Sequence, residues 1–133
     1  VRCGGGVNHR MGLFDAVLIK ENHIAAVGSI AATLDAVRRT HPDIKIEVEV
    51  ENMGELAQAL DAGVEMIMLD NFPAGALVDA TAFVDGRAVI EISGSVELAK
   101  LAEIKNTGAD YVSIGALTKH VRAIDFSMRI EKR

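Results

Sequence analysis

The segment at residues 44–51 reads Ile-Lys-Ile-Glu-Val-Glu-Val-Glu and could place several carboxylates side by side. Because successive side chains of a strand point to opposite faces, its apolar residues would share one face and its charged residues the other. The charged residues are Lys45, Glu47, Glu49 and Glu51. Buried carboxylates are costly unless they are paired or bind a cation. The pattern fits either a solvated edge strand or an interior that binds a metal or another cation, and its position between two strand–helix units favours the interior.

Cationic side chains precede this segment, and a single carboxylate follows it. A glycine-rich loop leads to His9 and Arg10, and Lys20 ends the next apolar run. Arginine binds carboxylates through a bidentate fork and lysine acts as a point charge. The three together suit a small dicarboxylate, although each alone is typical of a solvated surface. A later apolar run ends in Asp70, which either helps to hold Mg²⁺ and sugar hydroxyls or makes an ordinary helix cap or turn.

Two glycine-containing loops follow the last two apolar runs. Ser93-Gly94-Ser95 is one of them, and Gly115-Ala116 is the other. Backbone N–H groups at the start of a helix can bind a phosphate, and β/α barrels often place that site after their last strands. Ordinary turn chemistry explains either loop alone, but it explains both in succession less well.

The elements that must position these groups alternate between strands and helices. Strands are predicted at residues 16–20, 44–51, 65–70, 88–92 and 110–114. Helices are predicted at residues 27–40, 53–62, 74–84 and 96–107, and a short turn followed by some helix at 119–130. This alternation predicts parallel β/α units. Five strands cannot close an eight-stranded barrel, which takes about 250 residues, so either strands are missing or the sheet is open and doubly wound.

Cap residues and an internal repeat support this reading. The predicted caps are Ser29, Ser95 and an Asn52–Glu55 capping box at helix starts, and Gly63 and Gly108 at helix ends. Leu-Ala followed by helix, glycine, acid and apolar strand occurs twice, from residue 56 and from residue 101. The repeat predicts that Asp70 and Gly115 lie at equivalent strand ends, where barrels carry their chemistry.

Composition excludes several classes of function. The chain has 133 residues, 50% of them hydrophobic, and a net charge of −5, which suits one packed domain and argues against general nucleic-acid binding. The single cysteine, Cys3, cannot form an internal disulfide, which indicates a reducing compartment such as the cytoplasm. No apolar run approaches the ~20 residues that cross a bilayer. The N-terminus has neither an initiator methionine nor a signal-peptide pattern, which predicts a fragment.

An ordered series of motifs resembles the quinolinate phosphoribosyltransferase family. The motifs are Cys-Gly-Gly-Gly-Val-Asn-His-Arg-Met-Gly-Leu at 3–13, Leu-Ile-Lys-Glu-Asn-His at 18–23, Ile-Glu-Val-Glu-Val-Glu-Asn at 46–52, Ile-Met-Leu-Asp-Asn at 67–71, Glu-Ile-Ser-Gly at 91–94 and Ser-Ile-Gly-Ala-Leu-Thr-Lys-His at 113–120. No single motif is decisive, but the ordered set is very specific and looks bacterial. The resemblance implies an open, seven-stranded α/β barrel packed on an N-terminal sandwich domain. Residues 1–133 would form only the later βα units, without the sandwich domain and the first barrel strands.

The family resemblance also implies an activity and a set of site residues. Its enzymes convert quinolinate and phosphoribosyl pyrophosphate, with Mg²⁺, into nicotinate mononucleotide, pyrophosphate and CO₂ in NAD biosynthesis. Lys20, Glu49 and Asp70 would be the catalytic residues, and Glu49 and Asp70 would hold Mg²⁺ and the ribose hydroxyls. The quinolinate carboxylates would bind His9, Arg10 and Lys20, and the phosphate would bind Ser93, Gly94, Gly115 and either Lys119 or His120.

Departures from the family pattern leave some points open. Many relatives have a histidine directly after Ala-Leu-Thr, whereas this chain has Lys119 there and His120 next. The resemblance implies a homodimer or larger homo-oligomer in which a partner subunit completes the pocket, so the 133-residue chain alone should be nearly inactive. The alternatives are a paralogous phosphoribosyltransferase associated with molybdenum transport, another phosphate-binding barrel enzyme, and a non-catalytic barrel fragment.

Overall fold

The computed structural model describes residues 1–131 and contains one five-stranded sheet. Its strands are β1 Ala16–Ile19, β2 Lys45–Val50, β3 Met66–Asp70, β4 Val89–Ser93 and β5 Tyr111–Val112. They are all parallel and lie in chain order, β1-β2-β3-β4-β5. A doubly wound sheet reverses its strand order at a switch point. The order found here does not reverse, so the sheet is part of an open β/α barrel, as the sequence predicted.

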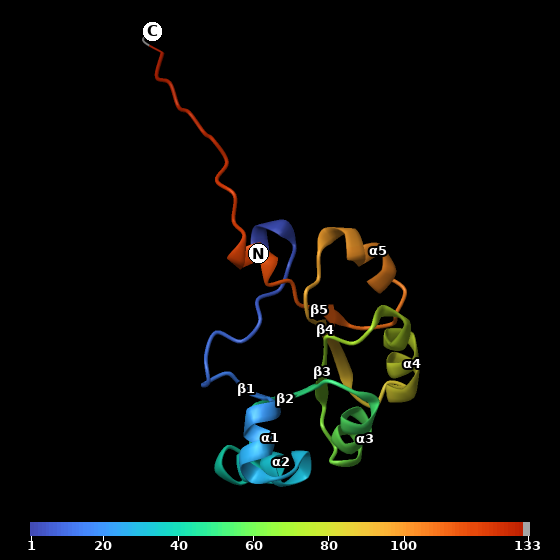
Figure 1. Cartoon of the computed structure of the whole chain (residues 1–133). Helices are drawn as coiled ribbons and strands as arrows, with labels where there is room; N and C mark the ends of the chain where they lie inside the picture. The colour runs from blue at the N-terminus through green and yellow to red at the C-terminus, as the bar shows by residue number, and fades with distance from the viewer. Residues whose placement is uncertain (132–133) are drawn as a thin grey trace.

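The helices lie along the convex side of this sheet, and the N-terminal segment runs along its other side (Figure 1). They are α1 Glu21–Val27, α2 Ile30–Thr40, α3 Met53–Asp61, α4 Ala74–Val84, α5 Leu101–Ile104 and α6 Ala116–Lys119, with 3₁₀ turns η1 at Arg2–Gly4 and η2 at Leu98–Lys100. No helix of the described residues is long and apolar enough to span a membrane.

A single apolar core fills the space between the sheet and the helices. The sheet contributes buried residues such as Val48, Ile67 and Ile92, and the helices contribute Leu34 and Leu56. Burying a side chain of this size stabilises the fold by about 1.5–3 kcal/mol. The side chains on the helix-facing side of each strand therefore pack in the core, and those on the other side can be polar.

Several local predictions are confirmed by the caps. The Ser29 hydroxyl accepts the Ala32 N–H at the start of α2, and the Asn52 side chain accepts the Glu55 N–H at the start of α3. The Glu55 carboxylate reaches back to the Glu51 N–H, 2.8 Å away. Gly63, with φ 69°, directly follows the cap of α3 in the left-handed conformation expected there. Gly108 has φ 90° but lies beyond Lys105, the residue that caps α5, so it does not end that helix as predicted.

The helix predicted at residues 27–40 begins later, as α2 at Ile30, and a separate helix α1 precedes it. Helix α1 ends at Val27, Gly28 follows with φ 108°, and Ser29 then caps α2. Helix α1 was not predicted, although it begins directly after Lys20. A glycine next to an N-cap residue marks the end of one helix and the beginning of another, and that signal was present at Gly28.

The last third of the chain is less regular than predicted. The helix expected at 96–107 is reduced to η2 and α5, and Ser95 has φ 47° and caps no helix. The strand expected at 110–114 is only Tyr111–Val112. Residues 120–131 form no helix and are exposed throughout. The helix prediction at 119–130 was wrong because Ile124, Phe126, Met128 and Ile130 recur every second residue, a period that suits a half-buried strand.

Candidate functional site

The concave face of the sheet, which the helices do not cover, carries a row of polar side chains. In the strand register Glu49 lies beside Met68 and Met68 beside Glu91, and Asp70 lies beside Ser93 one step further along. Glu49 is only 7% exposed and Glu91 4%. These residues come from three neighbouring strands, so the parallel register alone brings them together.

The alternation predicted for β2 is confirmed over its buried part. Val48 and Val50 lie in the helix-covered core, whereas Glu47 and Glu49 bond to His9 and Lys20. Glu51 does not belong to this set. It follows the end of β2 and is exposed, because the chain turns there to enter α3.

Lys20 and Glu49 form an ion pair at the end of β1. The Lys20 Nζ donates to Glu49 Oε2 over 2.6 Å. The hydrogen bond to Glu49 raises the pKa of the Lys20 ammonium above its ordinary value, and the charges of Glu49, Glu21 and Asp70 act in the same direction. Lys20 is therefore a cation at physiological pH. Lys20 directly follows β1 and Asp70 ends β3, so the two residues lie at the same end of this parallel sheet.

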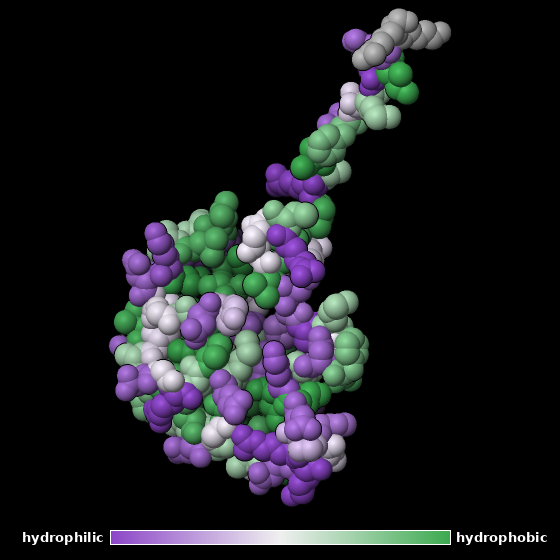
Figure 2. Space-filling view, turned by 180° about the vertical axis from the view of Figure 1, so that it is seen from behind, coloured by the Kyte–Doolittle hydropathy of each residue, from purple (hydrophilic) through white to green (hydrophobic). Residues whose placement is uncertain are grey.

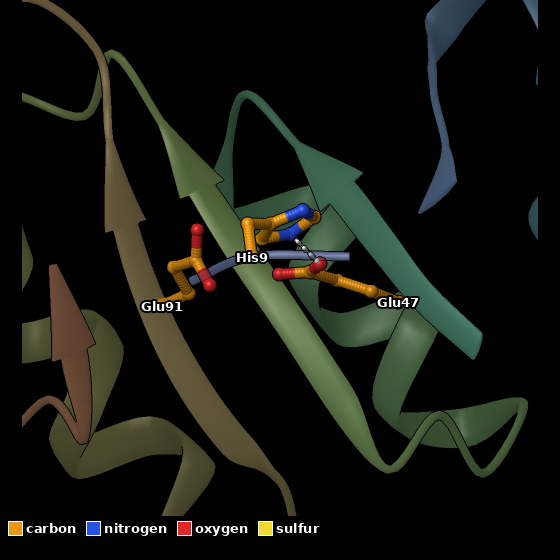
Figure 3. A group of neighbouring side chains, drawn as sticks. All are labelled: His9, Glu47 and Glu91. Atoms are coloured by element: carbon orange, nitrogen blue, oxygen red, sulfur yellow. Dashed lines mark hydrogen bonds and ion pairs between the residues drawn. The ribbon is translucent and has the colours of Figure 1, made fainter. Parts of the chain in front are cut away.

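A second group includes Glu47, which precedes Glu49 by one inward-facing position of β2. His9 lies over β3 between Glu47 and Glu91 (Figure 3). The His9 Nε2 and Glu47 Oε2 are 2.8 Å apart. Burial raises the pKa of the Glu47 carboxyl, the bond to His9 opposes that shift, and the charge of Glu91 adds to it. Ligand atoms of His9, Glu47 and Glu91 all lie within 4.8 Å of one another.

Glu91 was not among the predicted site residues, and Glu47 was predicted only as one of several charged residues on the inward face of its strand. Both are 4% exposed and lie on the concave face, and the Ser113 hydroxyl donates a hydrogen bond to Glu91. The available signal for Glu91 was a lone carboxylate inside the apolar run Ala-Val-Ile-Glu-Ile at 88–92. A charge at such a position is either paired or functional, since an unpaired one would be costly.

Arg10 lies apart from Lys20. Its guanidinium donates to the carbonyl oxygen of Ala16 over 3.3 Å, at the first residue of β1. Lys20 directly follows the other end of that strand. Arg10 is nevertheless close enough to Glu47 to favour its ionised form. His9, Arg10 and Lys20 were expected to bind one dicarboxylate together, but the structure places Arg10 at the start of β1 and not beside Lys20.

The two predicted phosphate loops are held in place differently. Ser93 ends β4, and its carbonyl accepts the Asn71 N–H over 3.1 Å, which ties the ends of β3 and β4 together. Gly94 has φ 101°, and an added Cβ would lie 2.6 Å from the Asn71 nitrogen. Gly115, in contrast, begins the short α6 beyond β5.

Lys119 and His120 are exposed at the end of α6. Within residues 1–131, no side-chain hydrogen bond or ion pair joins either of them to Ser93 or Gly94. The geometry therefore does not choose between them as a phosphate ligand.

The surface has a hollow beside the ion pair. Glu49, Glu21, Glu55 and Gln58 help to line it, at the carboxyl end of β2. A second hollow, lined in part by Arg87, lies at the amino ends of β3 and β4, away from the concave polar groups. The first lies at the end of the sheet where parallel β/α barrels carry their active sites.

Fold and site together define a β/α-barrel domain with a polar concave face. Residues 1–129 match the family model described as quinolinate phosphoribosyl transferase, C-terminal domain. The chain therefore belongs to the quinolinate phosphoribosyltransferase family, and the resemblance seen in its motifs is confirmed.

Named relatives agree with this assignment. The chain is 46% identical to a carboxylating nicotinate-nucleotide pyrophosphorylase of Mycobacterium leprae, over 96% of this chain and 46% of the relative. It is 40% identical to a probable enzyme of the same name from Bacillus subtilis, over 98% of this chain and 45% of the relative. The structure of nicotinate-nucleotide pyrophosphorylase from Francisella tularensis superposes with a TM-score of 0.90 at 45% identity, over 93% of this chain and 44% of that one. The chain thus spans about half the length of its relatives.

Proposed function

We propose that this chain forms the active-site portion of an enzyme that transfers a phosphoribosyl group from phosphoribosyl pyrophosphate to quinolinate, with loss of CO₂. The observation that carries the proposal is the cluster of Lys20, Glu49 and Asp70 at the carboxyl ends of three strands. It combines a fixed cation for an anionic acceptor with two carboxylates for a polyhydroxylated, pyrophosphate-bearing donor. The product is nicotinate mononucleotide, an intermediate of NAD biosynthesis.

The cationic groups would receive quinolinate. Lys20 is held by Glu49 and keeps its charge, so it can bind one carboxylate, and His9 faces the same concavity. Arg10 would contribute from the opposite end of β1 only if the loop before the strand moved. Orienting the acceptor in this way brings its ring nitrogen toward C1′ of the ribose, which lowers the entropic part of the barrier.

The acidic groups would serve the donor. Carboxylates on adjacent strand ends are the oxygen ligands that Mg²⁺ prefers, and Glu49 and Asp70 meet that requirement. Bound there, Mg²⁺ would offset the negative charge that develops on the departing pyrophosphate. Glu49 would then exchange or share its contact with Lys20, and both carboxylates could also accept hydrogen bonds from ribose hydroxyls.

The ends of β3 and β4 would bind the phosphate. Gly94 lets Asn71 pack directly against its backbone, and the bond from the Asn71 N–H to the Ser93 carbonyl fixes the loop, whose backbone N–H groups would face the phosphate. We include Gly115, Lys119 and His120 in this site by family pattern, and we expect the exposed end of α6 to reorganise when the donor binds. The enzyme would act in the cytoplasm as a homo-oligomer.

Turnover tests the proposal directly. The protein that carries this chain is incubated with quinolinate, phosphoribosyl pyrophosphate and Mg²⁺, and nicotinate mononucleotide and CO₂ are quantified. We expect stoichiometric formation of both products. Uracil and nicotinate serve as alternative acceptors, and preference for an acceptor without the second carboxylate would contradict the assignment. The isolated 133-residue chain is run in parallel, and we expect it to be nearly inactive.

A further inference from the structure

The contact between Glu47 and His9 has no role in the scheme above. We propose that Glu47 is a positioning residue, which holds the His9 imidazole against the concave face so that its second nitrogen meets a carboxylate of the acceptor. The inference rests on the proposed function for its substrate, but the contact itself can be measured without turnover.

His9 needs an anchor because nothing in its own segment supplies one. It lies between η1 and β1, in a stretch without helix or strand, and its side chain is 36% exposed. The bond of 2.8 Å to Glu47 ties this stretch to the middle of β2. Without it, the imidazole would have to be ordered when the acceptor binds, which costs side-chain entropy and weakens binding.

Each buried carboxylate on the concave face accepts a hydrogen bond from a different side chain. Glu49 receives Lys20, Glu91 receives the Ser113 hydroxyl, and Glu47 receives His9. Glu47 Oε1 has no hydrogen-bond partner among the described residues, so His9 provides the one hydrogen bond of that carboxylate. The dependence is mutual, since a buried carboxylate is costly without a partner.

The chemistry of imidazole explains what this orientation achieves. When Nε2–H donates to Glu47, Nδ1 is the nitrogen left for a ligand. As an imidazolium, His9 donates from both nitrogens, one to Glu47 and one to a carboxylate of quinolinate. A carboxylate behind a functional histidine fixes its ring orientation in the same way at metal sites.

A double-mutant cycle tests the proposal on the complete enzyme. Glu47→Leu removes the acceptor, whereas Glu47→Gln keeps an oxygen that can accept Nε2–H. We expect Glu47→Leu to raise KM for quinolinate ~10-fold, the usual loss for one charge-assisted contact, with kcat and KM for phosphoribosyl pyrophosphate little changed. Glu47→Gln should retain most of the affinity. In a His9→Ala background, Glu47→Leu should add less than about 2-fold.

Two further measurements separate positioning from general damage. Asp79→Asn, on the exposed side of α4, should leave every parameter unchanged. In the ¹⁵N spectrum, the His9 ring should show a hydrogen-bonded Nε2 in the native protein and in Glu47→Gln, but not in Glu47→Leu. Should Glu47→Leu fail to fold, Glu47→Asp replaces it, because it withdraws the carboxylate by one methylene and keeps the charge.

The outcomes are distinct. An equal effect of Glu47→Leu in both backgrounds, or a ring signal indifferent to Glu47, would overturn the positioning role. A native enzyme that ignores quinolinate while its His9 signal still depends on Glu47 would overturn the proposed function and leave the contact standing.

Discussion

At the scale of single residues, two buried carboxylates of the site each bond to one basic side chain. Lys20 is held by Glu49 and His9 by Glu47, at successive inward-facing positions of β2. Each pair is available to substrate from the concave side, and neither uses a residue of the apolar core. Substitution of Lys20 or His9 should therefore weaken substrate binding, and it also leaves a buried carboxylate without its partner, which costs stability.

Lys20→Ala is expected to weaken quinolinate use far more than binding of phosphoribosyl pyrophosphate. Loss of a charge-assisted contact costs ~1.5–3 kcal/mol, or roughly one to two orders of magnitude in kcat/KM for quinolinate. Steady-state kinetics with each substrate varied in turn measures the two effects. Lys45→Ala, an exposed lysine at the start of β2, is the matched control. Equal losses for both substrates would contradict the role given to Lys20.

Glu47 should also make stability depend on pH. Burial raises its pKa above the ordinary 4.5, so the folded chain binds this proton more tightly than the unfolded chain does. The contribution to stability is complete below pH 4.5 and is lost as pH rises through the folded pKa. The free energy of unfolding of the native chain, minus that of Glu47→Gln, should therefore fall with rising pH. Urea titrations at a series of pH values test this, and a constant or rising difference would show that Glu47 is not desolvated.

At the scale of elements, the caps place the strands correctly relative to one another. Asn52 starts α3 directly after β2, and Gly63 ends the following turn before β3. Arg38 of α2 donates to the carbonyls of Ala62 and Gly63. The turn between α3 and β3 is therefore bonded to α2 as well, and these contacts fix the direction in which β3 enters the sheet.

Asn52→Ala should lower the free energy of unfolding by about 1 kcal/mol, because the N-cap hydrogen bond at α3 is lost. Thermal or urea denaturation measures the change. Asn106→Ala, an exposed asparagine beyond α5, should change stability by less than about 0.5 kcal/mol. A loss at Asn106 equal to that at Asn52 would mean that the cap is not the cause.

At the scale of the whole molecule, the sheet ends in two open edges. Within residues 1–131, β1 pairs with β2 alone and β5 with β4 alone. Large apolar side chains are exposed in both terminal segments, for example Met11 at 84%, Phe14 at 81% and Phe126 at 84%. Figure 2 shows the C-terminal segment projecting from the body, with hydrophobic and hydrophilic residues along it. Open parallel edges and exposed apolar groups both promote association.

The isolated chain is therefore expected to associate in solution. Light scattering on residues 1–133 should give an average mass well above the 14.2 kDa of one chain. Phe14→Ser combined with Phe126→Ser should lower that mass, because it removes two exposed aromatic groups. A monodisperse monomer with full activity would contradict both the expected association and the expected dependence on residues outside this chain.

The sequence alone determined the features that depend on neighbours along the chain. The period of two in β2 separated Glu47 and Glu49 from Val48 and Val50, and short-range capping identified Ser29 and Asn52. Parallel β/α units followed from the alternation of elements, and the family from motifs in order. The strand period and the caps lie within a few residues, where backbone geometry dictates which side chains share a face, and the alternation and the motifs depend only on order along the chain.

Only the tertiary structure decided which of these groups meet. The strand register sets Glu91 level with Glu49 on the concave face, one inward-facing position from Glu47, and His9 reaches Glu47 and Glu91 because its loop crosses that face. The path of the same loop keeps the Arg10 guanidinium at the start of β1. Contacts between residues distant in sequence depend on register and on loop path, and neither of these has a local signature in the chain.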